Sequence, residues 1–96
     1  MPTIHLLIKG KVQGVFYRAT ARDVAEEIGI TGWIRNTEEE NVEAVVSGNR
    51  EQLKKFTDWC RQGPPKALVS EVIVTNKEDE NFLGFKIIRA GNSLGS

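Results

Sequence analysis

The sequence predicts one α/β domain of the α+β type, with strands and helices in the order β-α-β-β-α-β. Two stretches with helical spacing of apolar residues enclose two alternating, strand-like runs, and further alternating runs stand before and after them. A chain of 96 residues, 40 % hydrophobic and 27 % charged, suits a single domain with one modest core. Two right-handed crossovers around a central hairpin give a ferredoxin-like sandwich, an antiparallel sheet with both helices on one face.

The first strand and the first helix are predicted from two different spacings of apolar residues along the chain. Strand-like alternation places one set of residues on a single face: Ile4, Leu6 and Ile8. His5 shares the other face with Lys9, so we interpret it as a surface residue rather than a ligand. A helical stripe then runs at spacings of three and four residues, through Tyr17, Ala21, Val24, Ala25 and Ile28, and Gly29 ends the helix.

A hairpin is predicted next, from residues 30–35 and 42–47 with a polar turn at 36–41. The turn carries three glutamates, which we expect to face solvent, and no glycine. Because Asn tolerates a positive φ, Asn41 is expected to take that position.

The second helix has a clear start and a clear stop. Asn49 is a good N-cap, and Gln52 three residues later completes a capping box. The buried stripe should contain Leu53, Phe56, Thr57 and Cys60, with Cys60 as a small core residue rather than a reactive thiol. Residues 63–65, Gly-Pro-Pro, stop the helix, and strands at 69–75 and 85–89 complete the fold. Residues 90–96 are expected to form a flexible tail outside the domain of residues 1–89.

The most informative stretch is the loop of residues 10–18, Gly-Lys-Val-Gln-Gly-Val-Phe-Tyr-Arg, between the first strand and the first helix. A glycine turn at a helix N-terminus can direct several backbone N–H groups at one anion, most often a phosphate. Arg18 stands at the helix start, where a cation opposes the helix dipole, and no acidic residue occurs in residues 1–22. An anion would supply the missing partner, although a solvated surface arginine beside an ordinary turn also fits this stretch alone.

Other classes of site are disfavoured by composition. Thirteen basic and thirteen acidic residues give a net charge of zero, which argues against a nucleic-acid-binding surface. One histidine and one cysteine provide no Cys/His metal cluster, no internal disulfide and no Ser-His-Asp or Cys-His set. Without a signal peptide or a long apolar run, the chain is expected to be cytoplasmic, away from membranes, and a monomer.

Two motifs together resemble the acylphosphatase family. Residues 10–18 resemble its first signature, G-[RK]-V-Q-G-V-x-[FY]-R. Residues 32–37, Gly-Trp-Ile-Arg-Asn-Thr, followed by a hairpin, resemble its second. Taken alone, Asn36 is more easily interpreted as a turn residue. The resemblance covers nearly all of residues 3–89.

The resemblance implies hydrolysis of the carboxyl–phosphate bond of a small acyl phosphate, without metal or cofactor. By motif match, Arg18 and the N–H groups of Gln13, Gly14, Val15, Phe16, Tyr17 and Arg18 would bind the phosphate, with free phosphate or sulfate competing. Asn36 would orient the attacking water. An acyl phosphate is already activated, so positioning and charge stabilisation would suffice. Two alternatives remain: a non-catalytic anion-binding or regulatory module of the same fold, and an RNA-recognition module, for which Gly84-Phe85-Lys86 is a weak match.

Overall fold

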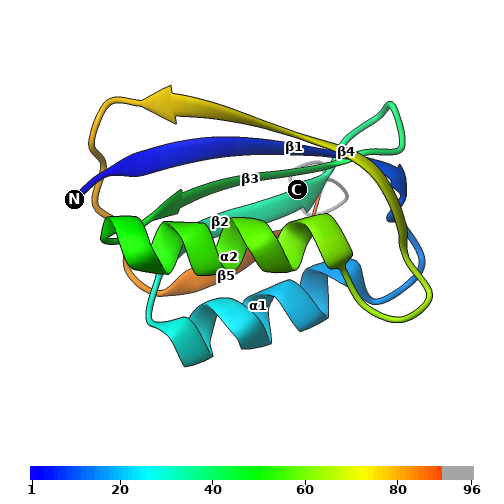
Figure 1. Cartoon of the computed structure of the whole chain (residues 1–96), viewed down its shortest axis with the longest axis horizontal. Helices are drawn as coiled ribbons and strands as arrows, with labels where there is room; N and C mark the ends of the chain where they lie inside the picture. Colours follow the sequence, from blue (N-terminus) through cyan, green and yellow to red (C-terminus); the bar gives the residue numbers. More distant parts are fainter. Residues whose placement is uncertain (90–96) are drawn as a thin grey trace.

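Both helices lie side by side against one face of a five-stranded sheet in the computed structural model, which describes residues 1–89 (Figure 1). The elements in chain order are β1 Thr3–Lys11, α1 Tyr17–Ile28, β2 Thr31–Asn36, β3 Val42–Ser47, α2 Arg50–Gln62, β4 Leu68–Lys77 and β5 Phe85–Ile88. The predicted ferredoxin-like order and the placement of both helices on one face are confirmed. The tail expected at residues 90–96 lies outside the described residues.

The strands are arranged β4-β1-β3-β2-β5 across the sheet. Antiparallel pairing joins β1 to both β3 and β4, and β2 to β3, so four strands match the predicted antiparallel sheet. The short β5 adds a parallel edge beside β2, with the register running from Gly32 opposite Phe85 to Arg35 opposite Ile88. The sheet as a whole is therefore mixed, and β5 brings the end of the described chain next to the end of β2.

The core lies between the helices and the sheet. Its largest fully buried side chains include Leu6, Ile8 and Ile34 from the sheet and Tyr17 and Phe56 from the helices. Cys60 is completely buried, and this burial raises the pKa of its thiol to about 12, so it is a core residue as predicted.

Phe85, the aromatic residue of the weak RNA-recognition match, is also part of this core. It is buried, and its ring centroid lies 5.9 Å from that of Phe56. An RNA-recognition module stacks bases on exposed aromatic residues of its sheet, and Phe85 is not available for this.

The β2–β3 hairpin differs from the expectation at its turn. Thr37 and Asn41 pair through an N–H···O=C bond of 2.9 Å, which leaves a three-residue loop of glutamates, all exposed. Loops of this length commonly place their last residue in the left-handed region after a type I turn. That residue is Glu40, with φ 67°, so the prediction that Asn41 takes the positive φ is wrong.

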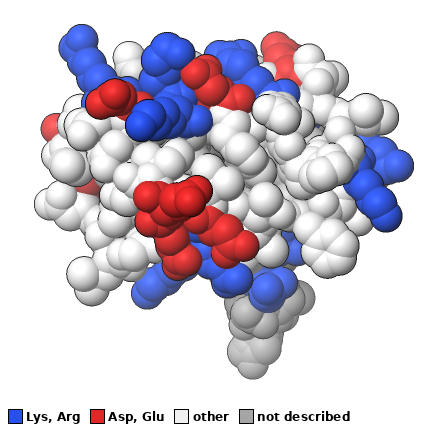
Figure 2. All heavy atoms as spheres, turned by 60° about the horizontal axis from the view of Figure 1, so that its bottom comes forward, with Lys and Arg blue, Asp and Glu red and all other residues white. Residues whose placement is uncertain are grey.

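The surface mixes both signs of charge. On the face shown in Figure 2, basic and acidic side chains alternate along one edge and an acidic cluster lies near the centre, with no continuous basic surface. Within residues 1–89, no helix combines the length and the apolar character needed to cross a membrane.

Candidate functional site

The loop between β1 and α1 is held in place by alternate side chains. Val12, Val15 and Tyr17 are almost fully buried, and the Tyr17 hydroxyl donates a 2.7 Å hydrogen bond to the carbonyl oxygen of Cys60 on α2. Of the residues between them, Gly14 and Phe16 are exposed and Gln13 is half-buried. Three buried anchors thus fix the loop backbone, which leaves its outer side open to a ligand.

The loop backbone turns sharply at two positions. Gly14 has φ 74° and Phe16 has φ 64°, and Phe16 is 78 % exposed. Glycine adopts the left-handed region without cost, but for a bulky residue such as phenylalanine this conformation is strained and typical of functional sites. Among residues 1–89, the backbone N–H groups of residues 13–18 donate to no backbone or side-chain acceptor.

The two helices differ in how their N-terminal N–H groups are capped. The capping box of α2 is formed as predicted: Asn49 accepts from the N–H of Gln52 at 2.8 Å, and Gln52 accepts from the N–H of Asn49 at 2.9 Å. By contrast, α1 begins at Tyr17 with no side-chain cap and no acidic residue in its first turn. Its open N–H groups and its dipole therefore favour an anion.

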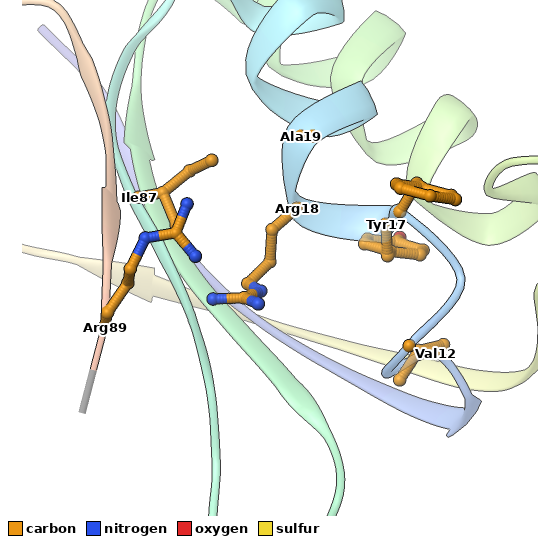
Figure 3. A pocket seen from close by; sticks show the side chains of 8 residues that line it. Val12, Tyr17, Arg18, Ala19, Ile87 and Arg89 are labelled. Atoms are coloured by element: carbon orange, nitrogen blue, oxygen red, sulfur yellow. The ribbon is translucent and has the colours of Figure 1, made fainter. Parts of the chain in front are cut away.

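Arg18, in the first turn of α1, extends into a cavity of about 320 Å³ (Figure 3). The residues that line this cavity are Val12, Gly14, Phe16, Tyr17, Arg18, Ala19, Ile87 and Arg89. Partial burial and, second, the positive charge of Arg89 lower the pKa of Arg18 below its ordinary value. Both effects disfavour the guanidinium charge, and an anion in the cavity would offset both.

Asn36 was expected to begin the turn but is the last residue of β2. It is not among the residues that line the Arg18 cavity. Its Oδ1 atom is shielded from solvent and accepts no hydrogen bond within residues 1–89. A buried acceptor without a donor costs about 1–3 kcal/mol. A water molecule that donates to Oδ1 would remove this cost and be held in a fixed orientation.

Gln13 connects the loop to the hairpin that follows Asn36. Its side-chain amide donates to the carbonyl oxygens of Thr37, at 3.0 Å, and Asn41, at 2.8 Å. The structure therefore brings Gly14, Phe16, Tyr17 and Arg18 around one cavity, with Val15 as a buried anchor and Gln13 as the link to the turn beside Asn36.

Arg89 is the charged cavity residue that the sequence reasoning missed. The alternation of Phe85, Ile87 and Arg89 was the available signal, because it places Arg89 on the same sheet face as two core residues. Within residues 1–89, no group of three or more His, Cys, Asp or Glu side chains is placed so that it could hold a metal ion.

The fold and these open donors define a ferredoxin-like domain with a loop suited to an anion. A family model described as "Acylphosphatase" matches residues 4–87. An acylphosphatase of Pelotomaculum thermopropionicum is 49 % identical over 84 residues, which are 86 % of this chain and 91 % of that protein. One of Haloquadratum walsbyi is 46 % identical over 85 residues, 88 % of this chain and 91 % of that protein.

Solved structures give the same result. The acylphosphatase of Coxiella burnetii superimposes with a TM-score of 0.87 at 39 % identity, covering 91 % of this chain and 92 % of that one. That of Bacillus subtilis gives 0.88 at 27 % identity, covering 92 % and 99 %. The chain belongs to the acylphosphatase family. It is a hydrolase that acts on small acyl phosphates, compounds in which a carboxyl group is joined to phosphate.

Proposed function

We propose that the phosphate group of the acyl phosphate binds to the N–H groups of residues 13–18 and to the Arg18 guanidinium, and that Asn36 orients the attacking water. The observation that carries this proposal is the set of unpaired N–H groups at the uncapped start of α1, with Arg18 beside them. Fixed donors of this kind stabilise the charge of a transferring phosphoryl group without reorganising during the reaction.

The reaction then requires little acid–base chemistry. The water oxygen attacks phosphorus, the bond from phosphorus to the acyl oxygen breaks, and its electron pair leaves with the carboxylate. The water gives one proton to a non-bridging phosphate oxygen, so the products are a carboxylate and dihydrogen phosphate. The carboxylate is a good leaving group and needs no proton, which fits a cavity lined by two arginines and no acid.

The phosphate-binding groups and Asn36 have different tasks in this proposal. The loop and Arg18 hold the phosphoryl oxygens, whereas Oδ1 of Asn36 accepts a hydrogen bond from the water and directs its lone pair. Gln13 supports both, because its amide joins the loop to the turn that follows Asn36.

The test is incubation with benzoyl phosphate, followed by measurement of phosphate release and of benzoate. Wild-type protein should release both in equal amounts, and Arg18→Ala and Asn36→Ala should each lose most of the activity. A chelator arm should leave the rate unchanged, since the proposal includes no metal or cofactor. Tight phosphate binding without release of benzoate would instead identify a non-catalytic anion-binding module.

The proposal also covers the extent of the catalytic unit, its oligomeric state and its cellular location. Residues 1–89 would form the complete catalytic unit, active as a monomer in the cytoplasm, without nucleic-acid or membrane partners. The unpaired Cys60 thiol is compatible with a reducing compartment. Light scattering at micromolar concentration would test the monomer, and cell fractionation would test the location.

A further inference from the structure

Arg89 directly follows β5, and Asn36 is the last residue of β2, the strand that β5 pairs with. Strands β2 and β5 are parallel, with Ile34 opposite Ile87 and Arg35 opposite Ile88. One step further along this register, Asn36 comes opposite Arg89. In a strand, alternate side chains share a face, so Asn36 follows the buried Ile34 and Arg89 follows Ile87, which packs against the core. Both side chains therefore belong to the helix-covered face, just beyond the last core layer.

Arg89 also faces Arg18. Both residues line the same cavity, and Figure 3 shows their side chains extending toward one another from opposite sides, Arg18 from the first turn of α1 and Arg89 from the end of β5. The other lining residues carry no charge, and neither arginine forms an ion pair with an acidic residue of the described chain. Two like charges thus converge on one space, and no acidic residue within 1–89 pairs with either of them.

This arrangement has an electrostatic cost in the free protein. The charge of Arg89 contributes to the lowered pKa of Arg18, second to the effect of burial. A bound dianion between the two guanidinium groups would convert their repulsion into two attractions. Guanidinium groups also match the geometry of phosphate oxygens, which they bind through paired N–H donors.

We propose that Arg89 is a second phosphoryl-binding group of the site, which contacts the substrate phosphate from the side opposite Arg18. This inference rests on the proposed function of the loop and Arg18. In a phosphoryl transfer the attacking and leaving oxygens lie roughly in line. Because Arg89 comes opposite Asn36 in the continued β2–β5 register, it stands on the side of the attacking water, away from the leaving acyl group. It therefore binds phosphoryl oxygens rather than the acyl part of the substrate.

The experiment is a calorimetric titration of inorganic phosphate into wild type, Arg89→Ala, Arg89→Gln and Arg89→Lys. We expect phosphate to bind about 10-fold or more weakly to the Ala and Gln variants, with a smaller loss for Lys, which keeps the charge but not the paired donors. Lys86→Ala is the matched control, since it removes one positive charge from β5, the strand that ends directly before Arg89. Lys86 lines a different hollow, together with Trp33. The phosphate affinity of the Lys86→Ala variant should therefore stay within about 2-fold of wild type.

A second measurement separates phosphate binding from recognition of the acyl group. Arg89→Ala should reduce kcat/KM by a similar factor for benzoyl phosphate and for a benzoyl phosphate that bears a carboxylate on the ring. Unchanged phosphate affinity in Arg89→Ala, or a loss confined to the carboxylate-bearing substrate, would overturn the inference. Failure of the proposed function gives a different result, because wild type itself would then neither bind phosphate at this loop nor hydrolyse benzoyl phosphate.

Discussion

The side chain of Gln13 donates a 2.8 Å hydrogen bond to the backbone carbonyl of Asn41, across 28 positions of sequence. A second bond from the same amide reaches the carbonyl of Thr37, at 3.0 Å. These two bonds join the loop before α1 to the hairpin turn that begins directly after Asn36. Since the proposed phosphate donors and the proposed water-orienting residue stand on opposite sides of this link, Gln13 sets their separation.

Gln13→Ala should therefore lower turnover more than it lowers stability. We expect kcat to fall about 10-fold, because small displacements of positioned groups cost up to about 100-fold in rate. Stability should fall by about 1 kcal/mol, since Thr37 and Asn41 still pair with each other. Gln13→Glu should be worse in both respects, because a carboxylate would face two carbonyl oxygens. The measurements are steady-state kinetics and urea unfolding, with the exposed Gln62→Ala as the control. Wild-type kinetics in Gln13→Ala would show that the link has no role in catalysis.

The elements that could be predicted are those with local signals. The helical stripe from Tyr17 to Ile28, the stop at Gly29 and the capping box at Asn49 each depend on residues within a few positions of one another. The same holds for the open start of α1, because the missing cap and the absence of acidic residues are visible in the sequence.

The parts that could not be predicted depend on pairing between distant segments. Residue type alone favoured Asn41 for the positive φ. The Thr37–Asn41 hydrogen bond fixes the loop at three residues, and the positive φ therefore falls on Glu40, the last of them. Arg89 enters the cavity only because β5 pairs with β2 in a particular parallel register. The acceptors of Gln13 are backbone carbonyls, which have no residue-type signature.

Arg18→Ala should abolish most phosphate affinity and turnover while leaving the fold intact. Charge-assisted hydrogen bonds contribute roughly 1.5–3 kcal/mol each, so we expect phosphate binding to weaken by at least about 10-fold. Arg18→Lys should recover little, because an ammonium lacks the paired donors. Thermal stability should stay the same or rise, since the charge of Arg18 opposes the helix dipole and faces Arg89. Phosphate titration and a thermal melt provide the readouts.

Arg22→Ala is the matched control for Arg18. It removes an arginine one turn further along α1 that does not line the cavity, so phosphate affinity should change by less than about 2-fold. An Arg18→Ala protein that is unfolded would mean that Arg18 is structural, and the assignment would be wrong.

Glu43 should make the free energy of unfolding depend on pH in the acidic range. Partial burial alone would raise the pKa of this carboxyl, but hydrogen bonds from His5 at 2.7 Å and Arg35 at 2.6 Å lower it. A lowered folded-state pKa means that the stabilisation is complete above the unfolded pKa, about 4.3, and is lost as pH falls through the folded value. Glu43→Gln should be about 1 kcal/mol less stable than wild type at pH 7, and the difference should shrink below about pH 4.

Urea unfolding at several pH values measures this difference. Glu71→Gln, at an exposed position of β4, is the control and should match wild type across the range. A Glu43→Gln deficit that persists undiminished at pH 3 would exclude the ionic explanation.

Free phosphate and sulfate should both stabilise the protein and compete with substrate. Each presents tetrahedral oxygens to the same N–H groups and arginines. A ligand that binds only the folded state adds about 2.7 kcal/mol of stability at 100 times its Kd, so the melting temperature should rise with phosphate concentration. The inhibition of benzoyl phosphate hydrolysis should be competitive. Mixed inhibition, or a melting temperature independent of phosphate, would place the anion away from the catalytic cavity.

Asn36→Ala should separate binding from chemistry. The proposed phosphate donors lie in the loop and in the arginines, so phosphate affinity should stay within about 2-fold of wild type. Losing one preorganised polar contact typically costs about 10²–10³ in turnover, and we expect kcat to fall by this amount. Because Oδ1 of Asn36 accepts no hydrogen bond from residues 1–89, removing it breaks no hydrogen bond to Oδ1 within the described chain, and stability should stay within about 1 kcal/mol of wild type. Turnover assays, phosphate titration and a thermal melt of the same preparation measure kcat, phosphate affinity and stability, respectively. Wild-type turnover would leave Asn36 as a turn residue, and a parallel loss of phosphate affinity would mean that it holds the anion rather than the water.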